Sequence, residues 1–81
     1  MRSENREIKP GQIYRHFKGN LYKIIGLATD SETGAKVVVY EAQYGANELY
    51  VRPYALFVEK LNAAQYPDAA QEYRFELMQQ L

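Results

Sequence analysis

Hydrophobic and polar residues alternate between positions 12 and 18, which is the period-two pattern of a half-buried β-strand. Over residues 12–18, Ile13 and Phe17 share one face of such a strand, whereas Tyr14 and His16 share the other. The pattern therefore predicts a first strand with an apolar side and a second side that is polar and aromatic.

Three further segments have the composition of strands, and turn-forming residues separate them. The segment 36–44 is the clearest, because its three consecutive valines and two tyrosines suit a pleated, half-buried surface. Glycine and asparagine, which tolerate positive φ, and the short polar residues Asp, Ser and Thr occupy the turns. The predicted strands are 12–18, 21–29, 36–44 and 48–52, with turns at 19–20, 30–34 and 45–47. Three antiparallel hairpins in series follow from this order.

Proline at position 53 ends the fourth predicted strand. Pro53 cannot donate a hydrogen bond to the ladder, and it is a suitable first residue for a helical turn over 54–57. Residues 58–61 are then expected to return to the sheet. Four or five short strands joined by tight turns predict a mainly β fold, a small rolled sheet or partly closed barrel. Rolling hides sheet edges that would otherwise favour aggregation.

The C-terminal segment is open to two interpretations. The alternation of Tyr73, Phe75 and Leu77 is typical of a strand, whereas the spacing of its apolar residues also fits a helix with a capping-box start. The residues on the helical face are Ala70, Tyr73, Leu77 and Leu81. Intrinsic propensity favours a helix over 68–81.

The chain is long enough for one core. Its 81 residues, 47% hydrophobic and 25% charged, are typical of a globular domain that buries about 60–65% of its unfolded surface. We expect a flexible arm over 1–9, a barrel over 10–61 and an extension over 62–81 that packs on the barrel.

The absence of cysteine excludes disulfides and thiolate metal sites. The longest apolar run, 37–40, is too short to span a bilayer, and the N-terminus lacks the apolar core of a signal peptide, so we expect a cytoplasmic protein with no membrane partner.

The charges of the chain balance. Ten basic and ten acidic residues give a net charge of zero, so affinity for nucleic acid would need a local positive patch. Arg15, Lys18 and Arg52 would form such a patch if their strands are neighbours. Arg52, just before Pro53, suits a bidentate contact with phosphate or carboxylate. The alternative, which the matched charges slightly favour, is internal pairing with Glu32, Glu41 or Glu59.

Other residues offer chemistry, each with a structural alternative. His16 can be a general base, a metal ligand or a phosphate donor, but a lone histidine on a strand is more often a surface or hydrogen-bonded residue. Without a second histidine or a cysteine, neither a metal site nor a cofactor is predicted. Ser31 and Glu32 could contact a ligand, although a self-capped loop is expected because no base or oxyanion hole is signalled. The eight tyrosines, Tyr44 among them, offer either a stacking platform for bases or a protein interface.

A more specific pattern is carried by Gly11, Tyr14 to Asn20, Tyr22, Ala28, Ser31 to Thr33, Val38 to Tyr40, Tyr44-Gly45, Val51 to Pro53, Phe57 and Glu59. In order and spacing, over about residues 9–61, these residues resemble the bacterial domain-of-unknown-function family 1653. The resemblance implies a small barrel of the SH3-like type and no established activity. Asp30 stands where the family pattern has histidine, and Tyr50 where it has tryptophan. The closing Arg-Phe pair of the family matches Arg74 and Phe75 only across a longer insert.

These observations favour a non-enzymatic binding module for an anionic or aromatic ligand, such as single-stranded RNA or a nucleotide. One alternative is a protein–protein interaction domain that binds a peptide or a second copy of the chain. Another is a small enzyme that uses His16 with Glu32 and Arg52. The oligomeric state is open. The candidate ligand-binding residues are Tyr14, Arg15, His16, Lys18, Ser31, Glu32, Tyr44 and Arg52.

Overall fold

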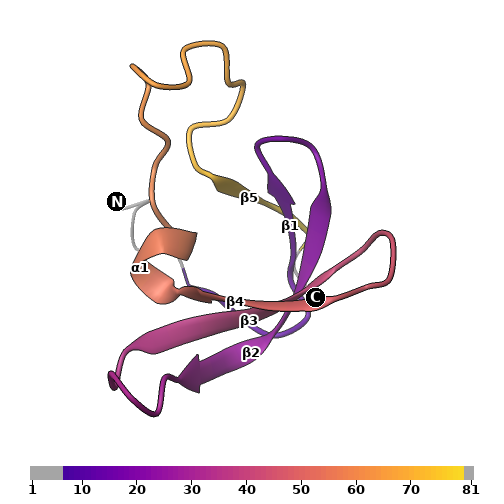
Figure 1. Cartoon of the computed structure of the whole chain (residues 1–81). Helices are drawn as coiled ribbons and strands as arrows, with labels where there is room; N and C mark the ends of the chain where they lie inside the picture. Colours follow the sequence, from indigo (N-terminus) through magenta and orange to yellow (C-terminus); the bar gives the residue numbers. More distant parts are fainter. Residues whose placement is uncertain (1–6, 80–81) are drawn as a thin grey trace.

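The computed structural model describes residues 7–79, which form a single antiparallel sheet with one short helix (Figure 1). Five strands lie in the order β4-β3-β2-β1-β5, and α1 directly follows β4. The mainly β fold and the three consecutive hairpins predicted from the alternation are confirmed. The elements are β1 Ile13–His16, β2 Leu21–Thr29, β3 Lys36–Ala42, β4 Leu49–Pro53, α1 Tyr54–Phe57 and β5 Phe75–Gln79.

The sheet curls so that its two edge strands approach each other through side chains. Register shifts occur between Ile24 and Gly26 in β2 and between Ile13 and Tyr14 in β1, and bulges of this kind bend a strand and increase its twist. Within residues 7–79, β4 and β5 are the edges and share no ladder. Even so, the Arg52 guanidinium of β4 lies 5.6 Å from the centre of the Phe75 ring of β5. The result is a rolled sheet with a seam between β4 and β5.

The core occupies the concave side of the sheet, and on β1 it takes Tyr14, which was predicted to bind a ligand, rather than Ile13. Tyr14 is 1% exposed and lies in the core, whereas Ile13 is only half-buried. Burial of the tyrosine is tolerated because its hydroxyl donates to Gln12 Oε1 at 3.0 Å and its ring packs edge-on against Phe57 at 5.5 Å. The core residues are Ile8, Tyr14, Ile24, Val38, Tyr40, Phe57 and Phe75.

The helix predicted over 68–81 is wrong, because residues 75–79 form β5, antiparallel to β1. Phe75 is 1% exposed and stacks on Phe57 at 4.1 Å. Pairing with an open strand edge and burial of this ring outweigh the small helix preference of the segment. Leu81, which completed the proposed helical face, lies outside the described residues.

Two segments outside the strands, residues 7–9 and 58–61, make further contacts within the domain. Within the expected arm 1–9, residues 1–6 lie outside the described part, but Ile8 is a core residue and Lys9 donates its backbone N–H to Gln12 Oε1 at 2.8 Å. The expectation of a loose arm is therefore wrong at Ile8. The expected return of residues 58–61 to the sheet is not observed, because Lys60 forms only an isolated antiparallel bridge with Tyr73, which precedes β5.

The helical content is small. α1 has four residues, and no helix within residues 7–79 has the length and hydropathy of a membrane span.

Candidate functional site

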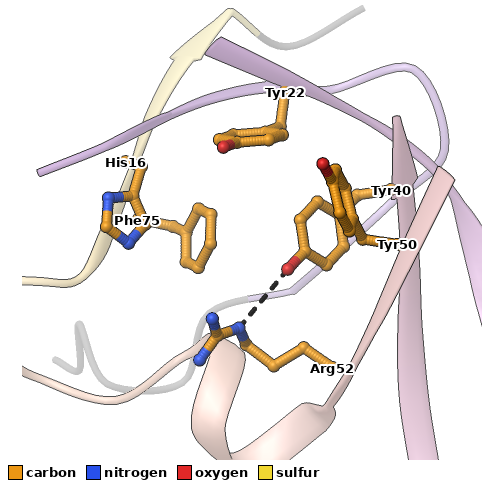
Figure 2. A pocket seen from close by; sticks show the side chains of 6 residues that line it. All are labelled: His16, Tyr22, Tyr40, Tyr50, Arg52 and Phe75. Carbon is orange, nitrogen blue, oxygen red and sulfur yellow. Dashed lines mark hydrogen bonds between the residues drawn. The ribbon is translucent and has the colours of Figure 1, made fainter. Parts of the chain in front are cut away.

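One cavity of about 260 Å³ opens on the concave side of the rolled sheet, and every strand contributes to its lining (Figure 2). Tyr40 and Phe75 form its floor, since they are only 5% and 1% exposed. The lining residues are His16 from β1, Tyr22 from β2, Tyr40 from β3, Tyr50 and Arg52 from β4, and Phe75 from β5.

The aromatic floor is closely packed. The Tyr40 ring centre lies 5.4 Å from that of Tyr22, 5.7 Å from that of Phe75 and 5.8 Å from that of Tyr50. Pairs at these separations contribute about 0.5–1.5 kcal/mol each beyond their buried area, which makes the floor rigid. The rings are too close together to admit a further ring between them, so a ligand would lie over the floor.

Arg52 places a positive charge beside this floor. Its Nε–H donates to the Tyr40 hydroxyl at 3.4 Å, and the guanidinium also faces the Phe75 ring. No carboxylate of residues 7–79 forms an ion pair with it. Figure 2 shows the guanidinium reaching from β4 toward the side of the pocket where His16 and Phe75 lie. Its charge is thus available to a ligand.

His16 lies beside Phe75 as a neutral imidazole. Its Nδ1 accepts the backbone N–H of Lys18 at 3.2 Å, and its ring packs edge-on against Phe75 at 5.0 Å. Burial, and then the charges of Arg74, Arg52 and Lys18, lower the pKa of His16 below its ordinary value of 6.5. At neutral pH the imidazole therefore carries its single proton on Nε2.

The tyrosine hydroxyls on the opposite rim are engaged with one another or with Glu48. Tyr22 and Tyr44 share a hydrogen bond of 2.9 Å, and burial together with this bond raises the pKa of Tyr22 to about 12. Tyr50 donates to Glu48 Oε1 at 3.1 Å, which raises the pKa of Tyr50. The hydroxyls of Tyr22 and Tyr50 therefore stay protonated at neutral pH, and Arg52 supplies the charge of the pocket lining.

Comparison with family profiles assigns the chain to a protein family. The profile described as "Protein of unknown function (DUF1653)" matches residues 12–77, which is most of the chain. The chain belongs to the DUF1653 family. A crystal structure of a DUF1653 protein from Bordetella bronchiseptica is similar, with a TM-score of 0.72 and 29% identity over 93% of this chain and 92% of that chain. No curated protein matches. The resemblance inferred from the residues is confirmed, and membership of the family assigns no activity.

Three of the predicted site residues of this DUF1653 member meet at the pocket. His16 and Arg52 line it, although they are 36 positions apart in the sequence, and Tyr44 lies at the rim through its bond to Tyr22. Lys18 lies close by on the exposed β1–β2 turn, with its ammonium 5.8 Å from the Phe17 ring centre.

Tyr14 and Arg15 lie elsewhere. Tyr14 is in the core. Arg15 is on the opposite face of β1, where its Nε–H donates to Gln71 Oε1 at 3.1 Å and its guanidinium pairs with Glu76 at 3.5 Å. Internal pairing, the alternative considered for the arginines, thus applies to Arg15, but with a glutamate that was not among the predicted partners.

Ser31 and Glu32 lie at the far end of the β2–β3 hairpin. Tyr22 is in the pocket, and Thr29 lies seven residue steps of about 3.3 Å each further along β2, so the loop begins roughly 23 Å away along the strand. Asp30 Oδ1 accepts the backbone N–H groups of Glu32 and Thr33 at 2.9 and 3.3 Å. This is the self-capped loop that the sequence favoured.

Sequence reasoning did not assign Tyr22, Tyr40, Tyr50 and Phe75 to the site. The tyrosines were recognised as a possible platform, but their faces depend on strand register. Phe75 was missed because its segment was interpreted as a helix, although the alternation around it was the correct signal. As for metals, no group of three His, Asp or Glu side chains within the described range could hold an ion.

Proposed function

We propose that this protein is a non-enzymatic binding module whose concave pocket takes an anionic ligand with an aromatic part, such as a nucleotide or a segment of single-stranded RNA. The observation that carries the proposal is the guanidinium of Arg52, which has no carboxylate partner among residues 7–79 and lies beside an open aromatic floor. Arginine beside stacking rings is a common arrangement in proteins that bind single-stranded nucleic acid.

The size and charge of the pocket support this ligand class. A cavity of about 150 Å³ is enough to hold benzene, so about 260 Å³ accommodates one planar ring system or a small group beside a ring. Aromatic rings can also bind cations. Here the positive charge of Arg52 repels a cation, and Arg74 and Lys18 add to the positive potential near His16.

A ligand titration with a matched pair of variants tests the proposal. Backbone and side-chain NMR signals are followed while nucleotides and short RNA oligomers are added at low and high salt. We expect shifts at His16, Tyr50 and Arg52 that weaken as salt rises, and their loss in Arg52→Gln. Lys23→Gln, which removes one charge from the opposite face of β2, is the control and should bind like the wild type. Equal binding by Arg52→Gln would refute the assignment of the pocket.

A protein partner is the second candidate, and one observation favours it. Leu49 and Val51 of β4 are 62% and 66% exposed on the side of the strand that faces away from the pocket. Binding to a peptide or to a second copy through these residues would be insensitive to salt and unaffected by Arg52→Gln. A catalytic group of His16, Glu32 and Arg52 receives no support, because Glu32 lies in the loop at the far end of β2.

A further inference from the structure

The polar atoms on the Arg52 side of the pocket follow a simple hydrogen-bond pattern. Arginine nitrogens can only donate, so in the 3.4 Å contact between Arg52 Nε and the Tyr40 hydroxyl, the tyrosine oxygen is the acceptor. The hydroxyl proton of Tyr40 is then left to donate, and it forms no hydrogen bond to an acceptor within residues 7–79. The two Nη groups of Arg52 likewise have no carboxylate partner there.

His16 completes this pattern. Its Nδ1 already accepts the backbone N–H of Lys18, so the neutral ring carries its proton on Nε2, which is a donor. The Arg52 guanidinium lies 5.6 Å from the centre of the Phe75 ring, against which His16 packs, and the Arg74 guanidinium lies 5.7 Å from the centre of the Phe17 ring, which also packs against His16. Arg74 is paired with Glu59 at 2.9 Å, whereas Arg52 is not paired in this way.

The opposite rim differs. Tyr22 and Tyr44 bond to each other, and Tyr50 donates to Glu48. Their rings, rather than their hydroxyl groups, are therefore what that rim presents to a ligand. The pocket thus has an aromatic side and a side at which Arg52, His16 and Tyr40 all donate.

We propose that the side formed by Arg52, His16 and Tyr40 binds a phosphoryl group, with the attached nucleoside lying over Tyr22 and Tyr50; this inference rests on the proposed function. The three donors come from β4, β1 and β3, so they approach from different directions. The phosphorus of a terminal phosphoryl group is tetrahedral, and its three free oxygens point in different directions, so each can accept from a different donor. The two oxygens of a carboxylate lie in one plane and suit only the paired N–H groups of the Arg52 guanidinium. The phosphoryl group can belong to a free nucleotide or to the 5′ end of an RNA strand.

Calorimetric and ³¹P NMR titrations distinguish the ligand groups. The probes are AMP, adenosine, inorganic phosphate, benzoate, and one RNA tetranucleotide with and without a 5′-phosphate. We expect AMP to bind about ten- to hundredfold more tightly than adenosine, the range that a hydrogen bond to a charged group supports. Phosphate should bind more tightly than benzoate. If the natural ligand is an RNA end, the 5′-phosphorylated tetranucleotide will bind more tightly than AMP. If it is a free nucleotide, AMP will bind at least as tightly as the phosphorylated tetranucleotide.

Single substitutions test whether the preference for AMP over adenosine depends on the donors of the pocket. Tyr40→Phe keeps the ring of the floor and should remove much of the preference for AMP over adenosine, as should Arg52→Gln. Tyr66→Phe removes a hydroxyl that lies outside the pocket and should leave the preference intact. Dispersed amide spectra verify that each variant is folded.

The outcomes separate the two proposals. Equal affinity for AMP and adenosine, with shifts at the pocket, would overturn the phosphoryl assignment and leave the binding function standing. Benzoate binding as tightly as phosphate would overturn it in favour of a carboxylate. Absence of binding by every probe would overturn both the phosphoryl assignment and the proposed function in its nucleotide form.

Discussion

Replacing Phe75 with alanine removes the side chain that joins β5 to the core and to the pocket floor. The ring is 1% exposed, stacks on Phe57 at 4.1 Å and packs edge-on against Tyr40 at 5.7 Å. Truncation of a buried phenylalanine costs about 3–5 kcal/mol. A domain of 81 residues has a free energy of unfolding of roughly 4–12 kcal/mol, so the substitution should remove at least about a quarter of the stability and would unfold a protein at the low end of this range.

Leu77 provides the matched control on the same strand. It is 41% exposed, and we expect Leu77→Ala to cost only about 1 kcal/mol. The comparison distinguishes a strand from a helix. A C-terminal helix would bury the face that contains Leu77 and expose Phe75, so Leu77→Ala would then cost more stability than Phe75→Ala.

Urea unfolding, followed by far-UV circular dichroism and tyrosine fluorescence, measures both free energies. Phe75→Leu, which keeps part of the buried volume, gives a measurable value if the alanine variant does not fold. A cost for Leu77→Ala equal to or above that of either Phe75 variant would refute the strand assignment.

Two further predictions concern ionisation and buried hydrogen bonds. The folded protein holds the pKa of His16 below its ordinary value of 6.5, so the unfolded chain takes up a proton on this residue more readily as the pH falls. The neutral imidazole therefore contributes to the stability of the fold above pH 6.5, and this contribution is lost on acidification. Urea unfolding at pH 7.5 and 5.5 should therefore show a larger loss for the wild type than for His16→Gln; parallel losses would contradict this. Tyr14→Phe removes the hydroxyl that donates to Gln12 Oε1. This oxygen still accepts the backbone N–H of Lys9, so it is not left without a hydrogen bond, and we expect about 1 kcal/mol of destabilisation. A change below about 0.3 kcal/mol in the same assay would show that this bond contributes little.

Local patterns identified the hairpins well and the orientation of the first strand poorly. The predicted segment 21–29 coincides with β2, and 54–57 with α1. Alternation shows that two faces exist but does not show which of them is buried when both carry large side chains. On β1 the choice was decided by Gln12, whose side chain satisfies the Tyr14 hydroxyl inside the core.

The site was only half accessible to sequence reasoning. His16 and Arg52 were chosen as single residues of suitable chemistry, and both line the pocket. Arg15 seemed equivalent to Arg52, yet it lies on the other face of the sheet and is paired with Glu76. Nothing local distinguishes these two arginines, which lie on the non-adjacent strands β1 and β4, because the register and curl of the sheet decide which one faces a cavity.

The first four strands and the helical turn could be identified from local sequence. Alternation, the turn residues at 19–20 and 45–47, Pro53 and the self-capped loop at Asp30 all act over a few neighbouring residues. Only the tertiary structure decided that Phe75 belongs to a strand, that Tyr40 and Phe75 form a common floor, and that Arg52 has no carboxylate partner within the described residues. The physical reason is distance along the chain. These contacts join residues up to 66 positions apart, as in the pairing of Ile13 with Gln79, and their energies depend on packing that exists only once the sheet has rolled.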